Sequence, residues 1–255
     1  MEYAVLLYES ETRWDQLSEA EQAQALAAHD RFTDMVHAGG GTILDGAELA
    51  PSAQARSLRW SGSQVDAVDG PYAETTEQFG GLYLIEAPDL DRMIEWCRHL
   101  PHSSEIRPTA VAEDPADDTG SAADTGPAGD EVAGSGAGED AEGLHVWVLL
   151  YGDEGEWEHA DEAQRAAVYD QHRRFSQSVV DAGGAVLGGR ELANSSNATS
   201  LRRSDGDWLI TDGPFIESIE QLSGWYDLRA PDMATLEQLL RGLPGGTTEI
   251  RPVAS

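Results

Sequence analysis

Two histidines in matching sequence contexts, His29 and His172, are the side chains of this chain best suited to acid–base chemistry. Each lies where apolar residues recur at helical spacing, so each belongs to the apolar stripe that a helix turns toward a sheet. Imidazole titrates near neutral pH, and a half-buried histidine could serve as a general acid or base. The alternative is a histidine at the edge of the core, hydrogen-bonded to a carbonyl or a carboxylate.

Two aspartates, Asp69 and Asp212, each open an Asp-Gly-Pro-aromatic sequence. Such a sequence predicts a tight turn, because aspartate accepts from nearby amides, glycine permits positive φ and proline fixes the direction of the exit. The functional alternative is that each carboxylate orients or polarises a histidine of its own half or of the other half of the chain.

Tyrosines and arginines on expected strands are the remaining candidates for ligand binding. Tyrosine hydroxyls could line a cavity, and an arginine could hold a substrate carboxylate through two hydrogen bonds. Core packing and internal ion pairs are the alternative for the same side chains. The candidates are Tyr8, Tyr83, Tyr151, Tyr226, Arg59 and Arg202, with Arg107 and Arg251 as a further pair.

Composition excludes several classes of function. The chain has 47 acidic residues against 16 basic ones, a formal charge of −31, and every basic residue is arginine. This balance argues against a nucleic-acid partner and against an anionic membrane. The histidines and aspartates are too far apart for the usual spacing of metal ligands, and no phosphate-binding glycine pattern is present. We therefore expect no metal and no cofactor.

Cys97, the single cysteine, excludes an internal disulfide. Its lack of a counterpart in the second half favours a packing role. The opening residues show neither a basic leader nor an apolar signal region, and no apolar run reaches the roughly 18 residues of a membrane helix. We expect a soluble, cytoplasmic protein.

The chain is a tandem duplication. Blocks of the first half return 143 positions later without a gap, and the sequence Glu-Ile-Arg-Pro returns after a slip of one residue. We expect copy one at residues 1–109, an acidic flexible linker at 110–143 and copy two at 144–255. The linker has no aromatic and no basic residue, so it cannot bury enough apolar surface to fold alone.

Each copy reads as strand, helix, four strands, helix and strand. In copy one the strands are expected at Tyr3–Tyr8, 42–49, 56–60, 64–68, 81–86 and Glu105–Arg107, and the helices at Ser18–Ala38 and Asp91–His99. The first strand is apolar on both faces, yet two helices cover one face only. The other face must therefore meet the second copy. This predicts an α+β fold in which two ferredoxin-like βαβ-type repeats form an intramolecular pseudo-dimeric α/β barrel, with copy one docked on copy two. A higher oligomer remains open.

The segment 69–91, which begins Asp-Gly-Pro-Tyr-Ala-Glu-Thr, and the closing Glu-Ile-Arg-Pro resemble the YCII-related superfamily. The similarity is to its DGPF branch, whose signature runs Asp-Gly-Pro-Phe-Ala-Glu-Thr-Lys-Glu, and it covers both copies. It implies a dimeric α/β barrel, a fold that includes small monooxygenases, isomerases and dehydrochlorinases. It also implies a His–Asp active site, which the motifs map onto His29 with Asp69 and onto His172 with Asp212.

Copy two departs further from the signature than copy one. The signature lysine is Thr76 in copy one and Ile219 in copy two, and Ser223 replaces Gly80. Any activity could therefore belong to one half.

Three functions remain open on these grounds. The first is a cofactor-independent lyase, isomerase or oxygenase-type enzyme that binds a small molecule in the pseudo-dimer cavity and uses the His–Asp pair. The second is a non-catalytic ligand-binding or accessory protein, linked to sigma-factor regulation as some members of the branch are. The third is a structural or protein-interaction role. A cavity lined by His29, Asp69 and tyrosines would favour the first two.

Overall fold

The computed structural model describes residues 1–14, 16–61, 64–73, 75–110, 143–204 and 207–254. All but the two end residues of the linker expected at 110–143 lie outside the described residues. Copy one contains β1 (Glu2–Glu9), α1 (Glu11–Trp14), α2 (Glu19–Ala38), β2 (Thr42–Glu48), η1 (Ser52–Gln54), β3 (Arg56–Ser61), β4 (Gln64–Asp69), β5 (Gln78–Glu86), α3 (Leu90–Cys97) and β6 (Ser103–Pro108).

Copy two repeats this order. Its elements are β7 (Leu144–Asp153), α4 (Glu154–His159), α5 (Glu162–Asp181), β8 (Ala185–Glu191), η2 (Ser195–Asn197), β9 (Thr199–Ser204), β10 (Asp207–Asp212), β11 (Glu220–Ala230), α6 (Met233–Leu240) and β12 (Thr247–Pro252). The short helices α1 and α4 and the 3-10 turns η1 and η2 were not expected from the sequence.

The two copies exchange hairpins. The first sheet has the strand order β10-β9-β6-β1-β5-β2, and the second has β4-β3-β12-β7-β11-β8. The hairpin β3–β4 of copy one therefore pairs with β12 of copy two, and the hairpin β9–β10 of copy two pairs with β6 of copy one. Each copy supplies four strands to its own sheet and two to the other.

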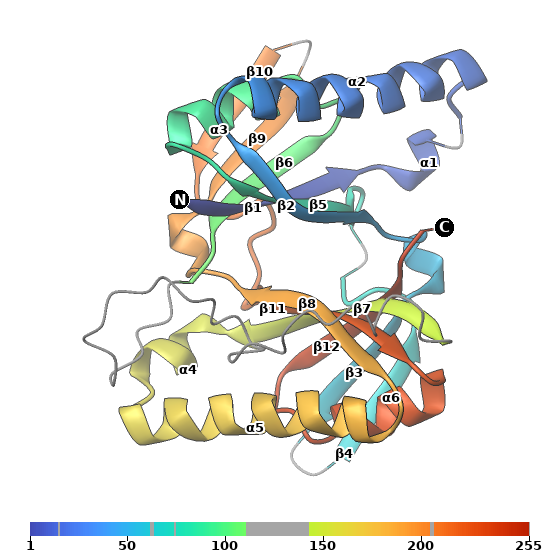
Figure 1. Ribbon diagram of the computed structural model, residues 1–255, viewed down its shortest axis with the longest axis vertical. Coiled ribbons are helices and arrows are strands. Elements are labelled where there is room, and N and C mark those ends of the chain that lie inside the picture. The colour runs from blue at the N-terminus through green and yellow to red at the C-terminus, as the bar shows by residue number, and fades with distance from the viewer. Residues whose placement is uncertain (15, 62–63, 74, 111–142, 205–206, 255) are drawn as a thin grey trace.

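The molecule has four layers, helices outside and two sheets inside (Figure 1). Helices α2 and α3 cover the outer face of the first sheet, and α5 and α6 cover the outer face of the second. Strand β1 shows why both layers are needed: Val5 packs with the helices, whereas Leu6 and Tyr8 join the core between the sheets. The expected pseudo-dimeric α/β barrel of two ferredoxin-like repeats is confirmed.

Local capping fixes the two long helices. The side chain of Ser18 accepts from the backbone N–H of Glu21 while the Glu21 carboxylate accepts from the N–H of Ser18, which forms the expected capping box. Asp161 and Gln164 form the same box at the start of α5. After α2, Gly40 takes φ +84°, a conformation that favours glycine. None of the described helices has the length and apolarity needed to cross a bilayer.

A β-bulge interrupts the pairing of β1 with β5. Leu7 lies opposite Gly81 and Tyr8 lies opposite Phe79, so Gly80 has no partner of its own. Bulges bend a strand and redirect its side chains, and they are common beside functional sites. This bulge borders the pocket described below.

Candidate functional site

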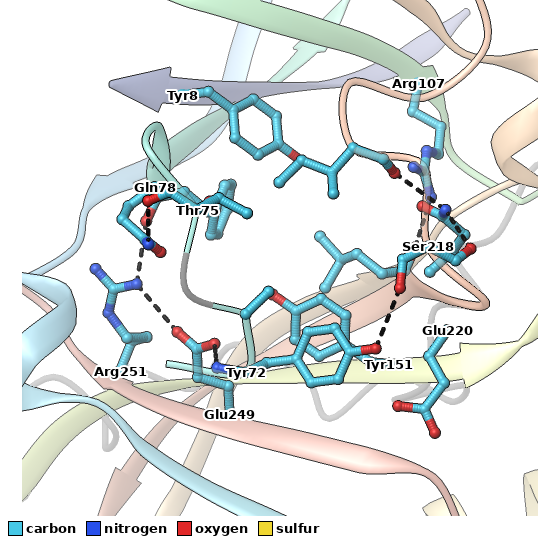
Figure 2. Close-up of a pocket in the computed structure, with 15 residues that line it drawn as sticks. Tyr8, Tyr72, Thr75, Gln78, Arg107, Tyr151, Ser218, Glu220, Glu249 and Arg251 are labelled. Atoms are coloured by element: carbon cyan, nitrogen blue, oxygen red, sulfur yellow. Dashed lines mark hydrogen bonds and ion pairs between the residues drawn. The ribbon is translucent and has the colours of Figure 1, made fainter. Parts of the chain in front are cut away.

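The space between the sheets is nearly filled by aromatic rings. Phe215 stacks on Tyr8 and Tyr72 stacks on Tyr151, with ring centroids 4.3 Å apart in both pairs. The remaining cavity measures about 50 Å³, room for a few water molecules (Figure 2). Tyr8 and Tyr151 were expected to line a ligand cavity, and they do line this one. However, the cavity contains neither His29 nor His172 among its lining residues.

Two buried glutamates tie the copies together around this cavity. The Glu105 carboxylate of copy one accepts from the backbone N–H of Phe215 in copy two at 2.7 Å, and Glu249 accepts from the N–H of Tyr72 at 2.7 Å. The Glu-Ile-Arg-Pro segment of each copy thus holds the Asp-Gly-Pro turn of the other.

Four arginines complete these links. Arg107 donates to Glu105 at 2.6 Å and to the carbonyl of Leu222 in copy two, and Arg251 donates to Glu249 at 3.0 Å. Arg59 and Arg202, expected as substrate clamps, instead donate to the carbonyls at the ends of the two Asp-Gly-Pro-aromatic turns. All four arginines therefore make hydrogen bonds that stabilise the fold.

The structure does not place the aspartates beside the histidines. Asp69 ends β4 in the second sheet, is 87% exposed and pairs with Arg56 at 2.5 Å, whereas His29 lies on α2 over the first sheet. Asp212 is also exposed, at the end of β10. The expected pairs are wrong in this respect, because the exchanged hairpins carry each aspartate away from the histidine of its own copy.

His29 lies instead in a pocket on the outer side of the first sheet. The pocket has a volume of about 310 Å³ and lies between α1, α2 and the strands β1, β2 and β5. Its lining residues are Leu7, Glu9, Trp14, Ala25, Leu26, His29, Asp30, Gly46, Ala47, Glu48, Gly80, Gly81, Leu82, Tyr83 and His102. The volume lies at the lower end of the range for small-molecule sites.

Four titratable side chains form a chain of polar contacts along this pocket, of which the first two are hydrogen bonds. His29 Nδ1 lies 2.8 Å from the Tyr83 hydroxyl, and His29 Nε2 lies 3.0 Å from His102 Nε2. His102 Nδ1 lies 3.3 Å from a carboxylate oxygen of Glu9. We call the four side chains, in the order Tyr83–His29–His102–Glu9, the relay.

Burial sets the protonation of the relay. Burial, followed by the negative charges of Glu48 and Glu11, raises the pKa of Glu9 to about 7. Burial also lowers the pKa of His29 and, helped by the proximity of His29, lowers the pKa of His102 to about 4. At neutral pH both imidazoles are therefore neutral, and Glu9 is divided between its ionised and protonated forms.

Tyr83 remains protonated at neutral pH. Burial first, and then the negative charges of Asp30 and Glu48, raise the pKa of the Tyr83 phenol to about 12. Its hydroxyl can therefore donate to His29 or accept from it, as the tautomer of the imidazole requires.

Copy two keeps only the first link. His172 Nδ1 lies 2.7 Å from the Tyr226 hydroxyl, as in copy one. Strand register shows that Gly152 follows Tyr151 where Glu9 follows Tyr8, and that Gly246 precedes Thr247 where His102 precedes Ser103. The second imidazole and the carboxylate are both absent from copy two, so the relay belongs to copy one.

Sequence reasoning missed Glu9 and His102. Alternation along β1 was a usable signal for Glu9, because Val5, Leu7 and Glu9 share the face on which His29 was expected. His102 gave no such signal, since it stands alone in a loop and copy two has no counterpart.

Comparisons with known proteins identify relatives of both copies. The family model of the YCII-related domain matches residues 1–105 and again residues 146–254. A protein of Rhizobium meliloti (strain 1021), described as uncharacterized protein R00369, is 32% identical over 120 residues, which cover 44% of this chain and 94% of that protein.

The solved structures that align with this chain are more distant. A mutant of chlorite dismutase from Candidatus Nitrospira defluvii aligns over 100% of this chain and 91% of its own, with a TM-score of 0.40 and 8% identity. The protein described as "Putative Chlorite dismutase TA0507" aligns over 100% of this chain and 94% of its own, with a TM-score of 0.39 and 12% identity. These values are too low to inform the chemistry of the pocket.

Proposed function

We propose that this chain, which belongs to the YCII-related domain family, binds a small molecule in the copy-one pocket and exchanges a proton with it through the relay. The observation that supports this is the continuous series of contacts from Tyr83 to Glu9, two hydrogen bonds and one 3.3 Å contact, along a pocket of about 310 Å³. The function is cofactor-independent acid–base chemistry of the lyase or isomerase type. We propose copy two, which lacks the relay, as a structural partner.

The relay can take two orders of proton positions, in both of which the 3.3 Å contact between His102 and Glu9 closes to a hydrogen bond. With Glu9 ionised, the Tyr83 hydroxyl donates to His29 Nδ1, His29 Nε2–H donates to His102, and His102 Nδ1–H donates to the carboxylate. With Glu9 protonated, every hydrogen bond reverses and both imidazoles change tautomer. A proton taken up at the Tyr83 oxygen therefore converts the first order into the second, and the relay gains one proton that ends on Glu9.

A carboxylate with a pKa near 7 suits this task, because a base is most effective when its pKa lies near the working pH. Neither histidine needs to become charged in either resting order. The Tyr83 hydroxyl would then act as a base with the strength of Glu9, because each proton that it takes up is balanced by one that reaches Glu9. His29 would accept the proton from Tyr83 and pass its own proton to His102.

The tautomers of the two histidines provide the test. Long-range ¹H–¹⁵N NMR should show His29 protonated at Nε2 and His102 at Nδ1 above pH 7, and the opposite tautomers at pH 6. Glu9→Gln should give the same tautomers at both pH values, because an amide takes up no proton in this range. His172 is the internal control, since glycines stand at the positions of His102 and Glu9 in copy two. Unchanged tautomers between pH 6 and pH 8 would contradict the relay.

Proton exchange with a carbon acid tests catalysis directly. With cyclohexanone in D₂O as the probe, we expect exchange of the protons beside the carbonyl to be lost in His29→Gln and retained in His172→Gln. Binding without exchange in the wild-type protein would instead favour the non-catalytic, accessory role.

A further inference from the structure

The charges around the copy-one pocket are all of one sign. Its described lining residues include three carboxylates, Glu9, Asp30 and Glu48, and no arginine. The two histidines of the pocket are neutral at pH 7. A ligand carboxylate or phosphate would enter this pocket without a counter-charge and against repulsion, whereas a cation would find partners.

Two of these carboxylates lie on either side of one strand. Glu9 is on β1 and Glu48 is on β2, and the glycine pair Gly80-Gly81 of β5 runs between them. A Cβ atom at Gly80 would lie 3.0 Å from the Glu9 carboxylate. The missing side chain of Gly80 thus leaves space open beside the Glu9 carboxylate, whereas a Cβ atom at Gly81 would meet the carbonyl of Ala47 instead. Repulsion from Glu48 contributes to the raised pKa of Glu9, as expected for two carboxylates that share a site.

Copy two fills the equivalent space with its own side chains. Tyr169, which corresponds to Leu26, donates its hydroxyl to the Glu191 carboxylate at 3.1 Å. Its ring packs edge-on against Trp157, with centroids 5.7 Å apart at 89°. Arg165 lies over the same indole, 5.5 Å from the ring centroid. In copy two, an aromatic ring and a positively charged side chain therefore occupy the space that is open in copy one.

The charge of Arg165 acts on the carboxylate of copy two. Burial raises the pKa of Glu191, while the Tyr169 hydroxyl and the positive charge of Arg165 oppose that rise. Glu191 corresponds to Glu48 of copy one and Trp157 corresponds to Trp14, so both walls of the site are retained.

Copy one lacks both occupants. Leu26 stands at the position of Tyr169 and is 54% exposed, and the neutral Gln22 stands at the position of Arg165. The Gln22 side chain donates to the carbonyl of Trp14 at 3.3 Å and brings no positive charge. The indole and the carboxylates of copy one are therefore left without the ring and the cation that copy two provides.

We propose that the ligand of copy one supplies these two parts, and that the pocket selects small arylalkylamines, in which an ammonium group is joined to an aromatic ring through a short alkyl chain. The ring would lie against Trp14 and Leu26, and the ammonium would lie between Glu9 and Glu48. This inference rests on the proposed function, because it assigns a substrate class to the same pocket.

Three probes of the same shape and different charge test the inference: 2-phenylethylamine, 2-phenylethanol and 3-phenylpropanoate. Calorimetry at pH 7 gives their dissociation constants, and the ring signals of His29 report whether each one enters the pocket. The amine should bind at least about tenfold more tightly than the alcohol, because it replaces a neutral hydrogen bond with a charge-assisted one. The propanoate should bind most weakly.

Two variants and a matched control locate the effect. Glu48→Gln should bring the amine to within about threefold of the alcohol, because one of the two carboxylates is neutralised. Leu26→Tyr should abolish binding of the amine by filling the site as copy two does, and its exposed position should tolerate the change. Glu191→Gln, the equivalent substitution in copy two, should leave all three affinities unchanged.

Several results would overturn the arylalkylamine assignment. Tighter binding of the propanoate, an unchanged preference for the amine in Glu48→Gln, or no shift of His29 with any probe would each do so. If the alcohol or the propanoate shifts His29 and Leu26→Tyr abolishes the shift, small-molecule binding in the pocket stands and only the charge class fails. The tautomer experiment decides the relay independently of all three probes.

Discussion

Replacing Glu105 with glutamine should destabilise the whole chain by about 3–5 kcal/mol, the usual cost of removing one member of a buried ion pair. The side chains of Glu105 and Arg107 are each only 1% exposed. Glutamine keeps the shape of Glu105 and can still accept from the N–H of Phe215. It leaves the guanidinium of Arg107 buried without its counter-charge, and this is the source of the predicted loss.

Urea unfolding followed by tryptophan fluorescence and circular dichroism measures the effect. Because each sheet contains strands of both copies, the two signals should share one transition, and the denaturant slope should not change. Glu95→Gln is a matched control: it removes a carboxylate that pairs with Arg92 on the surface, and we expect a loss of less than about 1 kcal/mol.

The double variant tests whether the loss comes from the unpaired charge. Arg107→Met together with Glu105→Gln removes both charges, so it should cost at least about 1 kcal/mol less than the sum of the two single losses. If Glu105→Gln costs no more than the surface control, or if the two losses simply add, the link between the copies does not depend on this pair.

Three further predictions concern other parts of the molecule. Burial lowers the pKa of His172 to about 4 from an ordinary value of 6.5. The unfolded chain therefore binds more protons at this position, and the free energy of unfolding falls as the pH drops from 6.5 to 4. His172→Gln should reduce the loss of stability between pH 7 and pH 4 by about 3 kcal/mol, measured by urea unfolding at both pH values. Gly80→Ser should push the Glu9 carboxylate toward solvent and lower its pKa from about 7 toward 4.5, measured by ¹³C NMR titration; an unchanged pKa would show that the glycine does not hold the space open. Gly39→Ala would place a Cβ atom 2.5 Å from the buried ring of Trp96 and should lower the unfolding free energy by about 1–3 kcal/mol, whereas a neutral result would mean that the indole moves freely.

Much of the fold could be predicted because its causes are local or periodic. The duplication shows as a constant offset, and the capping residue Ser18 with Glu21 marks the start of a helix. The two apolar faces of the strand from Val5 to Tyr8 require a cover on each side, which led to the layered arrangement. His29 lies on the face of α2 that packs on the sheet, beside Tyr83, as the helical spacing of the apolar residues predicted.

The exchange of hairpins could not be predicted from the sequence. Backbone N–H and C=O groups make the same ladder whichever copy supplies the neighbouring strand, so the side chains of β3 and β9 carry no mark of their partner. This exchange is what separates Asp69 from His29. The relay was missed for a related reason, since Glu9 and His102 come together only through tertiary structure and copy two replaces both with glycine.

Both halves belong to one chain, so they occur one to one in every molecule. In a dimer of identical chains, a substitution on one side of the twofold axis appears on the other side as well. Here each side can change alone. Tyr169 and Ser223 could arise in one half while Leu26 and Gly80 remained in the other, without loss of the common core. Joining the two copies in one chain thus allows their outer pockets to differ, so that the site is filled in copy two and open in copy one.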